Sequence, residues 1–225
     1  MSGMIDFACG GHSYSGYLAP SASGSGPGVV VLQEWWGLVG HIKDVADRFA
    51  AAGFTALAPD LYAGKTADEP DDAASLFMAL NIAETDKVLS CAIRRLLDDP
   101  ATTGDKVGVV GFCMGGQLSL YAACENPETI GACVNFYGIH PNVHPNFANL
   151  GAPLLGLFGE DDPMTSPEVV AAMDSELNAL GKPHEFVTYA GVGHAFFNND
   201  RPAYNAEAAA DAWERVLVLF REHLG

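Results

Sequence analysis

Two periodicities of apolar residues run through the chain, one typical of strands and one typical of helices. Six short segments are predicted to be strands, and the first two are almost wholly apolar, as in a sheet that is covered on both faces. They span residues 28–33, 54–59, 106–112, 130–137, 152–159 and 184–190. Between them, apolar residues recur at helical spacing over residues 41–53, 85–99, 114–125 and 166–181, and a last helix places Trp213, Val216, Leu217, Phe220 and Leu224 on one face. This alternation predicts a mostly parallel central sheet with helices on both faces.

Two further short strands precede this pattern. They span residues 4–8 and 13–18, and the Gly10-Gly11 turn joins them. Segment 20–28, rich in Ser, Gly and Pro, reads as a surface loop and not as a domain boundary. We therefore predict one α/β domain over residues 1–225, with a short N-terminal antiparallel hairpin.

Charge and composition narrow the range of partners. The chain has 11 basic and 28 acidic residues, a net charge of −17, which repels nucleic acid and anionic lipid. No apolar run approaches the ~18 residues of a membrane span, and the N-terminus lacks a secretory pattern. The cysteines are odd in number and scattered, so we expect reduced thiols in a cytoplasmic protein; they are Cys9, Cys91, Cys113, Cys124 and Cys133. A homodimer is left open.

The segment Gly111–Gly115 reads Gly-Phe-Cys-Met-Gly, where a strand passes into a helix. A glycine-bracketed turn in this context presents a nucleophile in α/β-hydrolases. Cys113 would then sit at a helix N-terminus, which favours a thiolate, and the Met114 N–H would face a developing oxyanion. Alone, Cys113 would be read as a small core residue. A dinucleotide-binding loop is the other alternative, but Cys113 stands where its middle glycine belongs.

A hydrolase of this fold needs an acid and then a histidine further along the chain. Asp162, with Asp161 as the alternative, follows strand 152–159, and His194 lies in a glycine-rich loop after strand 184–190. Both sit at the C-terminal edge of the predicted sheet, where parallel sheets place their sites. The other histidines lie in a turn, near helix ends or before a strand, namely His12, His41, His184 and His223. His140 and His144 have metal-ligand spacing but adjacent prolines and no further ligands, so we expect no metal.

Strand 28–33 is followed by a carboxylate, Glu34, although a desolvated carboxylate is costly unless it is paired. The same loop should supply the second oxyanion donor, the Trp35 N–H, which places Glu34 beside the nucleophile.

The blocks LQEWWGL, APDLY, GFCMGG, FGEDDP and GHAFFN…RPAYN resemble those of the dienelactone hydrolase (carboxymethylenebutenolidase) family, in order and over nearly the whole chain. The resemblance implies the α/β-hydrolase fold and no cofactor. It also implies that Cys113 is the nucleophile, His194 its base and Asp162 the residue that orients His194. Glu34 would help remove the thiol proton, and Trp35 and Met114 would donate to the oxyanion.

The chain departs from that family where the substrate carboxylate is bound. The family has one arginine in the segment after PDLY and another four residues past the histidine. Here no Lys or Arg occurs between Lys65 and Lys87, and Asn198 holds the second position. We therefore expect a neutral or less anionic substrate as readily as an anionic one. Our candidate substrate-binding residues are Trp36, Phe112, Phe197, Asn198 and Arg201.

Together these features predict hydrolysis of a small-molecule ester or lactone through an acyl-thioester. Two alternatives are a non-catalytic binding or regulatory protein on a hydrolase scaffold and a nicotinamide-dependent oxidoreductase.

Overall fold

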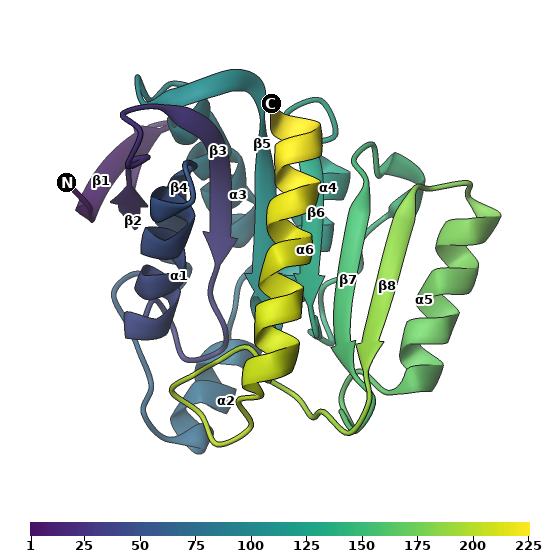
Figure 1. Cartoon of the computed structure of the whole chain (residues 1–225). Coiled ribbons are helices and arrows are strands. Elements are labelled where there is room, and N and C mark those ends of the chain that lie inside the picture. Colours follow the sequence, from purple (N-terminus) through teal and green to yellow (C-terminus); the bar gives the residue numbers. More distant parts are fainter.

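The predicted strands lie in one eight-stranded sheet of order β1-β2-β4-β3-β5-β6-β7-β8 in the computed structural model, which describes residues 1–225 (Figure 1). The strands are β1 (Gly3–Cys9), β2 (His12–Ala19), β3 (Gly26–Leu32), β4 (Thr55–Pro59), β5 (Thr102–Phe112), β6 (Ile130–Phe136), β7 (Leu154–Gly159) and β8 (His184–Tyr189). Strands β3 to β8 run parallel, while β2 is antiparallel to both β1 and β4. The predicted mostly parallel sheet with an N-terminal hairpin is confirmed.

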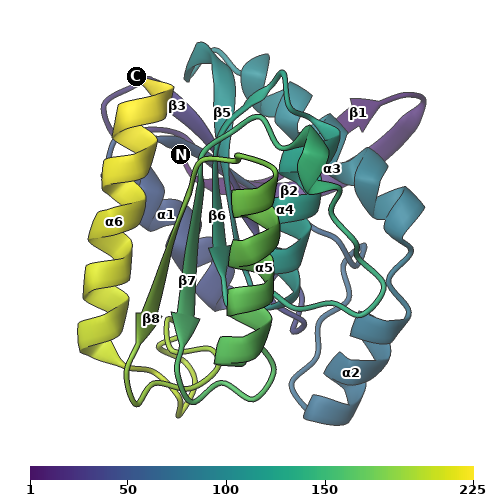
Figure 2. The same ribbon diagram turned by 90° about the vertical axis from the view of Figure 1, so that its right-hand side faces the viewer.

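Helices cover both faces of the sheet, as predicted (Figure 2). α1 (Gly40–Ala51) and α6 (Ala206–Leu224) pack on one face, and α3 (Ile82–Leu97), α4 (Met114–Glu125) and α5 (Pro167–Ala179) pack on the other. Each face buries its own apolar cluster, one of 31 residues and one of 27. Burial on both sides explains why β3 and β4 carry uninterrupted apolar runs. None of these helices is both long and apolar enough to cross a membrane.

One helix was not predicted. α2 (Pro70–Met78) lies beyond the C-terminal ends of the strands, at the bottom of Figures 1 and 2. It starts with a proline and buries one residue, Ala73, so it has almost no apolar stripe to mark it. Its position matters because its last turn reaches the site described below.

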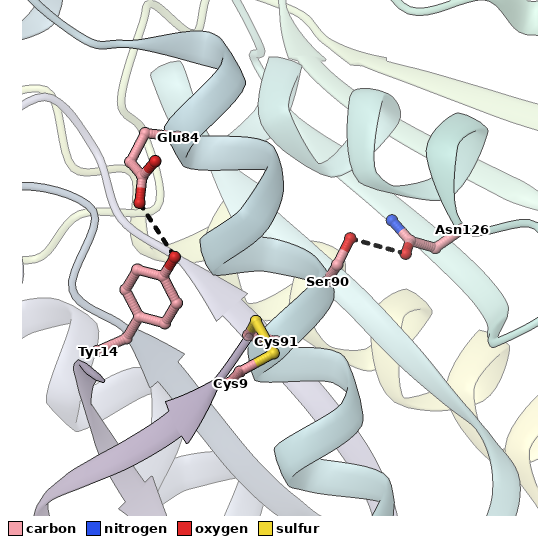
Figure 3. Close-up of a disulfide and its surroundings, with 6 residues drawn as sticks. All are labelled: Cys9, Tyr14, Glu84, Ser90, Cys91 and Asn126. Carbon is pink, nitrogen blue, oxygen red and sulfur yellow. Dashed lines mark hydrogen bonds between the residues drawn. A yellow bond between two sulfur atoms is a disulfide. The ribbon is translucent and has the colours of Figure 1, made fainter. Parts of the chain in front are cut away.

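A disulfide joins Cys9, at the end of β1, to Cys91 on α3 (Figure 3). The expectation that all cysteines are reduced is therefore wrong. The two residues are 82 positions apart, and only the packing of the hairpin against α3 brings their Cα atoms to 5.7 Å. The Tyr14 hydroxyl donates a hydrogen bond to Glu84 of α3, which is a second link between the hairpin and this helix. Because disulfides are rare in most cytosolic proteins, the cysteines no longer argue for a cytoplasmic location, which stays a prediction.

Candidate active site

Cys113 lies at the sharp turn between β5 and α4, and its backbone has φ 53° and ψ −117°. A positive φ is strained for a residue with a side chain, and such strain persists only where the surroundings enforce it. The glycines on either side make the turn feasible. A Cβ on Gly111 would overlap the Gly115 carbonyl, and a Cβ on Gly115 would overlap the Leu32 carbonyl on the neighbouring strand. The Gly-x-Cys-x-Gly spacing is thus a steric requirement of this turn.

The environment of Cys113 disfavours the thiolate. Burial raises the pKa of the thiol, and the nearby Glu34 charge raises it further, while the backbone N–H groups of Met114 and Trp35 face the sulfur and offset part of the effect. The N–H group at the helix N-terminus does lower the pKa, as expected, but desolvation and the like charge of Glu34 outweigh it. The two N–H groups approach the sulfur from the first residue of α4 and from the loop after β3.

His194 and Asp162 form a tight pair at the same edge of the sheet. His194 Nδ1 lies 2.6 Å from Asp162 Oδ2, and Asp162 is 1% exposed. The same carboxylate accepts hydrogen bonds from the Met164 and Thr165 N–H groups and from the Thr165 hydroxyl. Burial alone would raise the pKa of Asp162, but the hydrogen bonds from His194 and Thr165 outweigh it and lower the pKa. Asp161 is exposed, so the structure favours Asp162 over Asp161 as the partner of His194.

His194 directs its second nitrogen toward the site. Because the carboxylate of Asp162 only accepts, Nδ1 carries the hydrogen and Nε2 holds a lone pair in the neutral ring. Nε2 is buried and has no hydrogen-bond partner. It is therefore free to take a proton from a group that enters the cavity.

Glu34 follows β3 and is 2% exposed, so its carboxylate is buried. Its Oε2 accepts a hydrogen bond of 2.6 Å from the Asn198 side-chain amide. Burial raises the pKa of Glu34, and His41, Asn198, His194 and Arg201 offset part of that rise. The second carboxylate oxygen, Oε1, is buried and has no hydrogen-bond partner.

A cavity of 350 Å³ opens above these groups. Its walls include Cys113, His194 and Glu34, together with the apolar side chains of Trp35, Trp36, Phe77, Ile139, Pro141, Met164 and Ala195. The only cationic side chain in the wall is Arg201, whose guanidinium lies 3.6 Å from the centre of the Trp36 ring. A larger cavity of 520 Å³ lies between β8 and α6, but no cysteine lines it.

Residues 14–224 match the sequence profile of the dienelactone hydrolase family. The chain belongs to the dienelactone hydrolase family. It is 37% identical to "Protein usf" of Aquifex pyrophilus, with all of both chains covered. It is 33% identical, again over all of both chains, to an Aquifex aeolicus (strain VF5) protein that bears the provisional name carboxymethylenebutenolidase. The crystal structure of a provisionally named dienelactone hydrolase from Klebsiella pneumoniae superposes with a TM-score of 0.90, at 28% identity and with 99% of each chain covered. As a member of this family, the protein is a hydrolase.

Two of the five candidate substrate-binding residues of this dienelactone hydrolase family member line the cavity, namely Trp36 and Arg201. Phe112 and Phe197 stack on each other in the core, with ring centres 5.2 Å apart. The Asn198 side-chain amide donates its hydrogen bond to Glu34. Phe112, Phe197 and Asn198 are each 1% exposed and do not line the cavity, so the structure does not support the prediction that they contact substrate.

Sequence reasoning missed Ile139, Pro141, Met164 and Ala195 of the cavity wall, and two aromatic residues of the site. Phe77 comes from α2, which no periodicity marked, and it lines the cavity. Tyr137, with φ 40°, packs edge-on against the His194 ring with ring centres 5.0 Å apart. Tyr137 directly follows a buried strand, which in principle places it at the edge where His194 lies. His140, one of the pair weighed as metal ligands, instead bonds the Phe77 carbonyl through Nε2 and accepts from the Asn142 N–H through Nδ1.

Proposed function

We propose that this protein hydrolyses carboxylic esters or lactones through a Cys113 acyl-thioester. Cys113 is the nucleophile, His194 is the general base and acid, and Asp162 holds the imidazole in its Nδ1–H tautomer. The observation that carries the proposal is that a thiol on a strained turn and an imidazole with a free Nε2 line one cavity, while a buried carboxylate behind the imidazole orients it.

The first half of the reaction forms the thioester. The substrate carbonyl oxygen lies against the Met114 and Trp35 N–H groups. The thiol proton passes to His194 Nε2, with the Glu34 carboxylate assisting its departure from sulfur. The thiolate then forms a C–S bond to the carbonyl carbon, the C–O bond breaks, and the imidazolium gives the proton to the leaving oxygen.

The second half releases the acid. His194 takes a proton from a water molecule, the hydroxide attacks the thioester carbonyl, and the C–S bond breaks. The departing thiolate takes the proton back from His194, which restores the thiol. Because a thiolate leaves more readily than an amine, the tetrahedral intermediate of an amide would revert, whereas activated esters, enol esters and lactones go forward.

The resting thiol fits this scheme. A buried protonated Cys113 is a weak nucleophile toward adventitious electrophiles. Substrate that fills the apolar cavity brings a carbonyl to the two N–H donors, and developing negative charge then has partners that the resting thiolate lacks. Activation is thereby coupled to occupancy of the cavity.

The cavity also indicates a substrate class. Its wall is largely apolar, and Arg201 is its one cationic side chain, held flat on Trp36. A planar apolar ester or lactone that bears at most one carboxylate fits such a wall. Replacing Arg201 by Gln should lower kcat/KM for a carboxylate-bearing lactone ~10-fold or more and leave a neutral ester unchanged. Arg201→Lys is the matched control, since it keeps the charge but loses the planar fork; equal losses on both substrates would refute the role of Arg201.

The function itself is tested with a panel of p-nitrophenyl esters, simple lactones and dienelactone. Wild type should turn over at least one of them, and Cys113→Ala should abolish that turnover. Cys124→Ala is the control, since Cys124 is another buried free cysteine, in the last turn of α4. Activity that survives in Cys113→Ala would remove the mechanism. A wild type inert toward the whole panel would favour the binding-protein alternative.

A further inference from the structure

Helix α2, which brings Phe77 to the cavity, has a small attachment to the rest of the molecule. Ala73 is its one buried residue, and in its last turn only Leu76 and Phe77 are partly buried. One hydrogen bond joins α2 to a segment other than its own flanks, and it comes from His140 in the loop after β6. The helix lies apart from the layers that cover the sheet, at the lower right of Figure 2. The placement of Phe77 therefore depends strongly on its contacts with His140.

His140 is 3% exposed, and both of its ring nitrogens have partners. Nδ1 lies 3.1 Å from the Asn142 backbone nitrogen, which donates, so Nδ1 carries no hydrogen. In the uncharged ring Nε2 then carries the hydrogen and donates it to the Phe77 carbonyl oxygen, 3.2 Å away. Burial lowers the pKa of His140, which favours this uncharged form. The carbonyls in the last turn of a helix lack partners within it, so the imidazole caps the C-terminal end of α2.

The His140 ring also packs on the Phe77 side chain. The two ring centres lie 4.3 Å apart, and the planes are tilted by 45°. Trp35 packs edge-on against the same phenyl ring, with centres 6.5 Å apart. Phe77 and Trp35 line the cavity, as do Ile139 and Pro141, the chain neighbours of His140, whereas His140 itself does not. One buried imidazole thus links wall residues from α2 with wall residues from its own loop.

Building on the proposed hydrolysis in this cavity, we propose that His140 is a positioning residue that fixes Phe77 in the cavity wall and thereby sets the affinity for substrates with an aromatic ring. Aromatic rings attract one another only at specific tilts and offsets, so a phenyl ring that shifts loses contact with a planar substrate. A small substrate that reaches only Cys113 and the two N–H donors does not need this part of the wall.

Two variants of His140 separate its two hydrogen bonds. In His140→Asn the shorter side chain keeps an acceptor for the Asn142 N–H group but cannot reach Phe77. In His140→Gln the amide nitrogen takes the place of Nε2 and keeps the donor for Phe77. His144→Asn is the matched control, because His144 lies in the same loop, is exposed and makes no hydrogen bond through its ring. Thermal unfolding by circular dichroism establishes that each variant is folded.

The kinetic test compares an aromatic lactone, dihydrocoumarin, with a small enol ester, vinyl acetate. His140→Asn should raise KM for dihydrocoumarin ~10-fold and change kcat less than ~2-fold, because the lost contact acts on binding and not on the chemical step. Its kcat/KM for vinyl acetate should stay within ~2-fold of wild type. His140→Gln should restore most of the affinity for dihydrocoumarin. In a Phe77→Ala background, His140→Asn should change kcat/KM for dihydrocoumarin less than ~2-fold.

Hydrogen exchange tests the structural part without any turnover. Mass spectrometry of a peptide that spans α2 should show backbone exchange ~10-fold faster in His140→Asn than in wild type, and near wild-type exchange in His140→Gln and His144→Asn. Unchanged exchange of α2 in His140→Asn, or equal losses of kcat/KM on both substrates, would overturn the proposal. A wild type inert toward every ester and lactone would instead count against the proposed function, and the exchange rates would still decide whether His140 fixes α2.

Discussion

The Cys9–Cys91 disulfide gives a quantitative prediction about stability. It closes a loop of 82 residues that contains β2 to β4, α1, α2 and the first part of α3. Together with the Tyr14–Glu84 hydrogen bond it ties the hairpin at the sheet edge to α3. In the chain-entropy treatment, crosslinking a loop of that length disfavours the unfolded state by about 4.5 kcal/mol. For a chain of this size that corresponds to a Tm difference of roughly 9–18 °C.

The perturbation is Cys9→Ser, chosen because Cys9 is only partly buried and a serine hydroxyl there can reach water. Native-state relaxation takes back some of the entropic gain, so we expect a loss of at least ~2 kcal/mol. Thermal unfolding followed by circular dichroism measures it, with and without dithiothreitol. Wild type should drop to the Tm of the variant when reduced, and the variant should not respond to the reductant.

A thiol titration under denaturing conditions provides the control. The oxidised protein should show three free thiols, those of Cys113, Cys124 and Cys133. Five thiols in protein that has seen no reductant, or equal Tm values for wild type and Cys9→Ser, would refute the reasoning. The first result would also restore the argument for a reducing compartment.

Three further predictions concern the site. Asp162→Asn should lower kcat ~10³–10⁴-fold with little change in Tm, because the amide no longer selects the Nδ1–H tautomer of His194. Steady-state kinetics on an ester measure the loss, and a loss under tenfold would argue that Asp162 does not orient His194. Glu34→Gln should speed alkylation of Cys113 by iodoacetamide at pH 8, since removing a negative neighbour lowers the pKa of the thiol. The same variant should slow ester turnover, because the carboxylate no longer assists removal of the thiol proton. Slower alkylation would contradict the electrostatic effect of Glu34 on Cys113. Gly115→Ala should destabilise the protein by ~3 kcal/mol or more, measured by urea unfolding, because its Cβ would overlap backbone carbonyls; a stable variant would show that the turn can relax.

Much of the architecture follows from short-range features of the sequence. Apolar runs of strand length separated by helical stripes dictate a covered parallel sheet, and Gly10 and Gly11, both at positive φ, turn the N-terminal hairpin. The glycine spacing around Cys113 is equally local, since it reflects overlaps within a few residues and with the adjacent strand. Asp162 and His194 could be expected at the same edge of the sheet, because the C-terminal ends of parallel strands meet there.

Features that depend on contacts between distant segments could not be predicted. The disulfide needs β1 and α3 to meet across 82 residues. The choice between Asp161 and Asp162 depends on which carboxylate of one turn points inward. The sequence suggests that Phe112 and Phe197 line the cavity, because they lie close to Cys113 and His194 along the chain. In the structure both side chains point into the core instead.

The most direct test of the central claim is to trap the covalent intermediate. Wild type mixed with p-nitrophenyl acetate and quenched in acid should carry one acetyl group, and mass spectrometry of its peptides should place that group on Cys113. His194→Gln should form this adduct far more slowly, because the same base removes the thiol proton before acylation and activates water for deacylation. An acetyl group on any other residue, or turnover at the wild-type rate in a protein whose Cys113 never becomes acylated, would contradict the account.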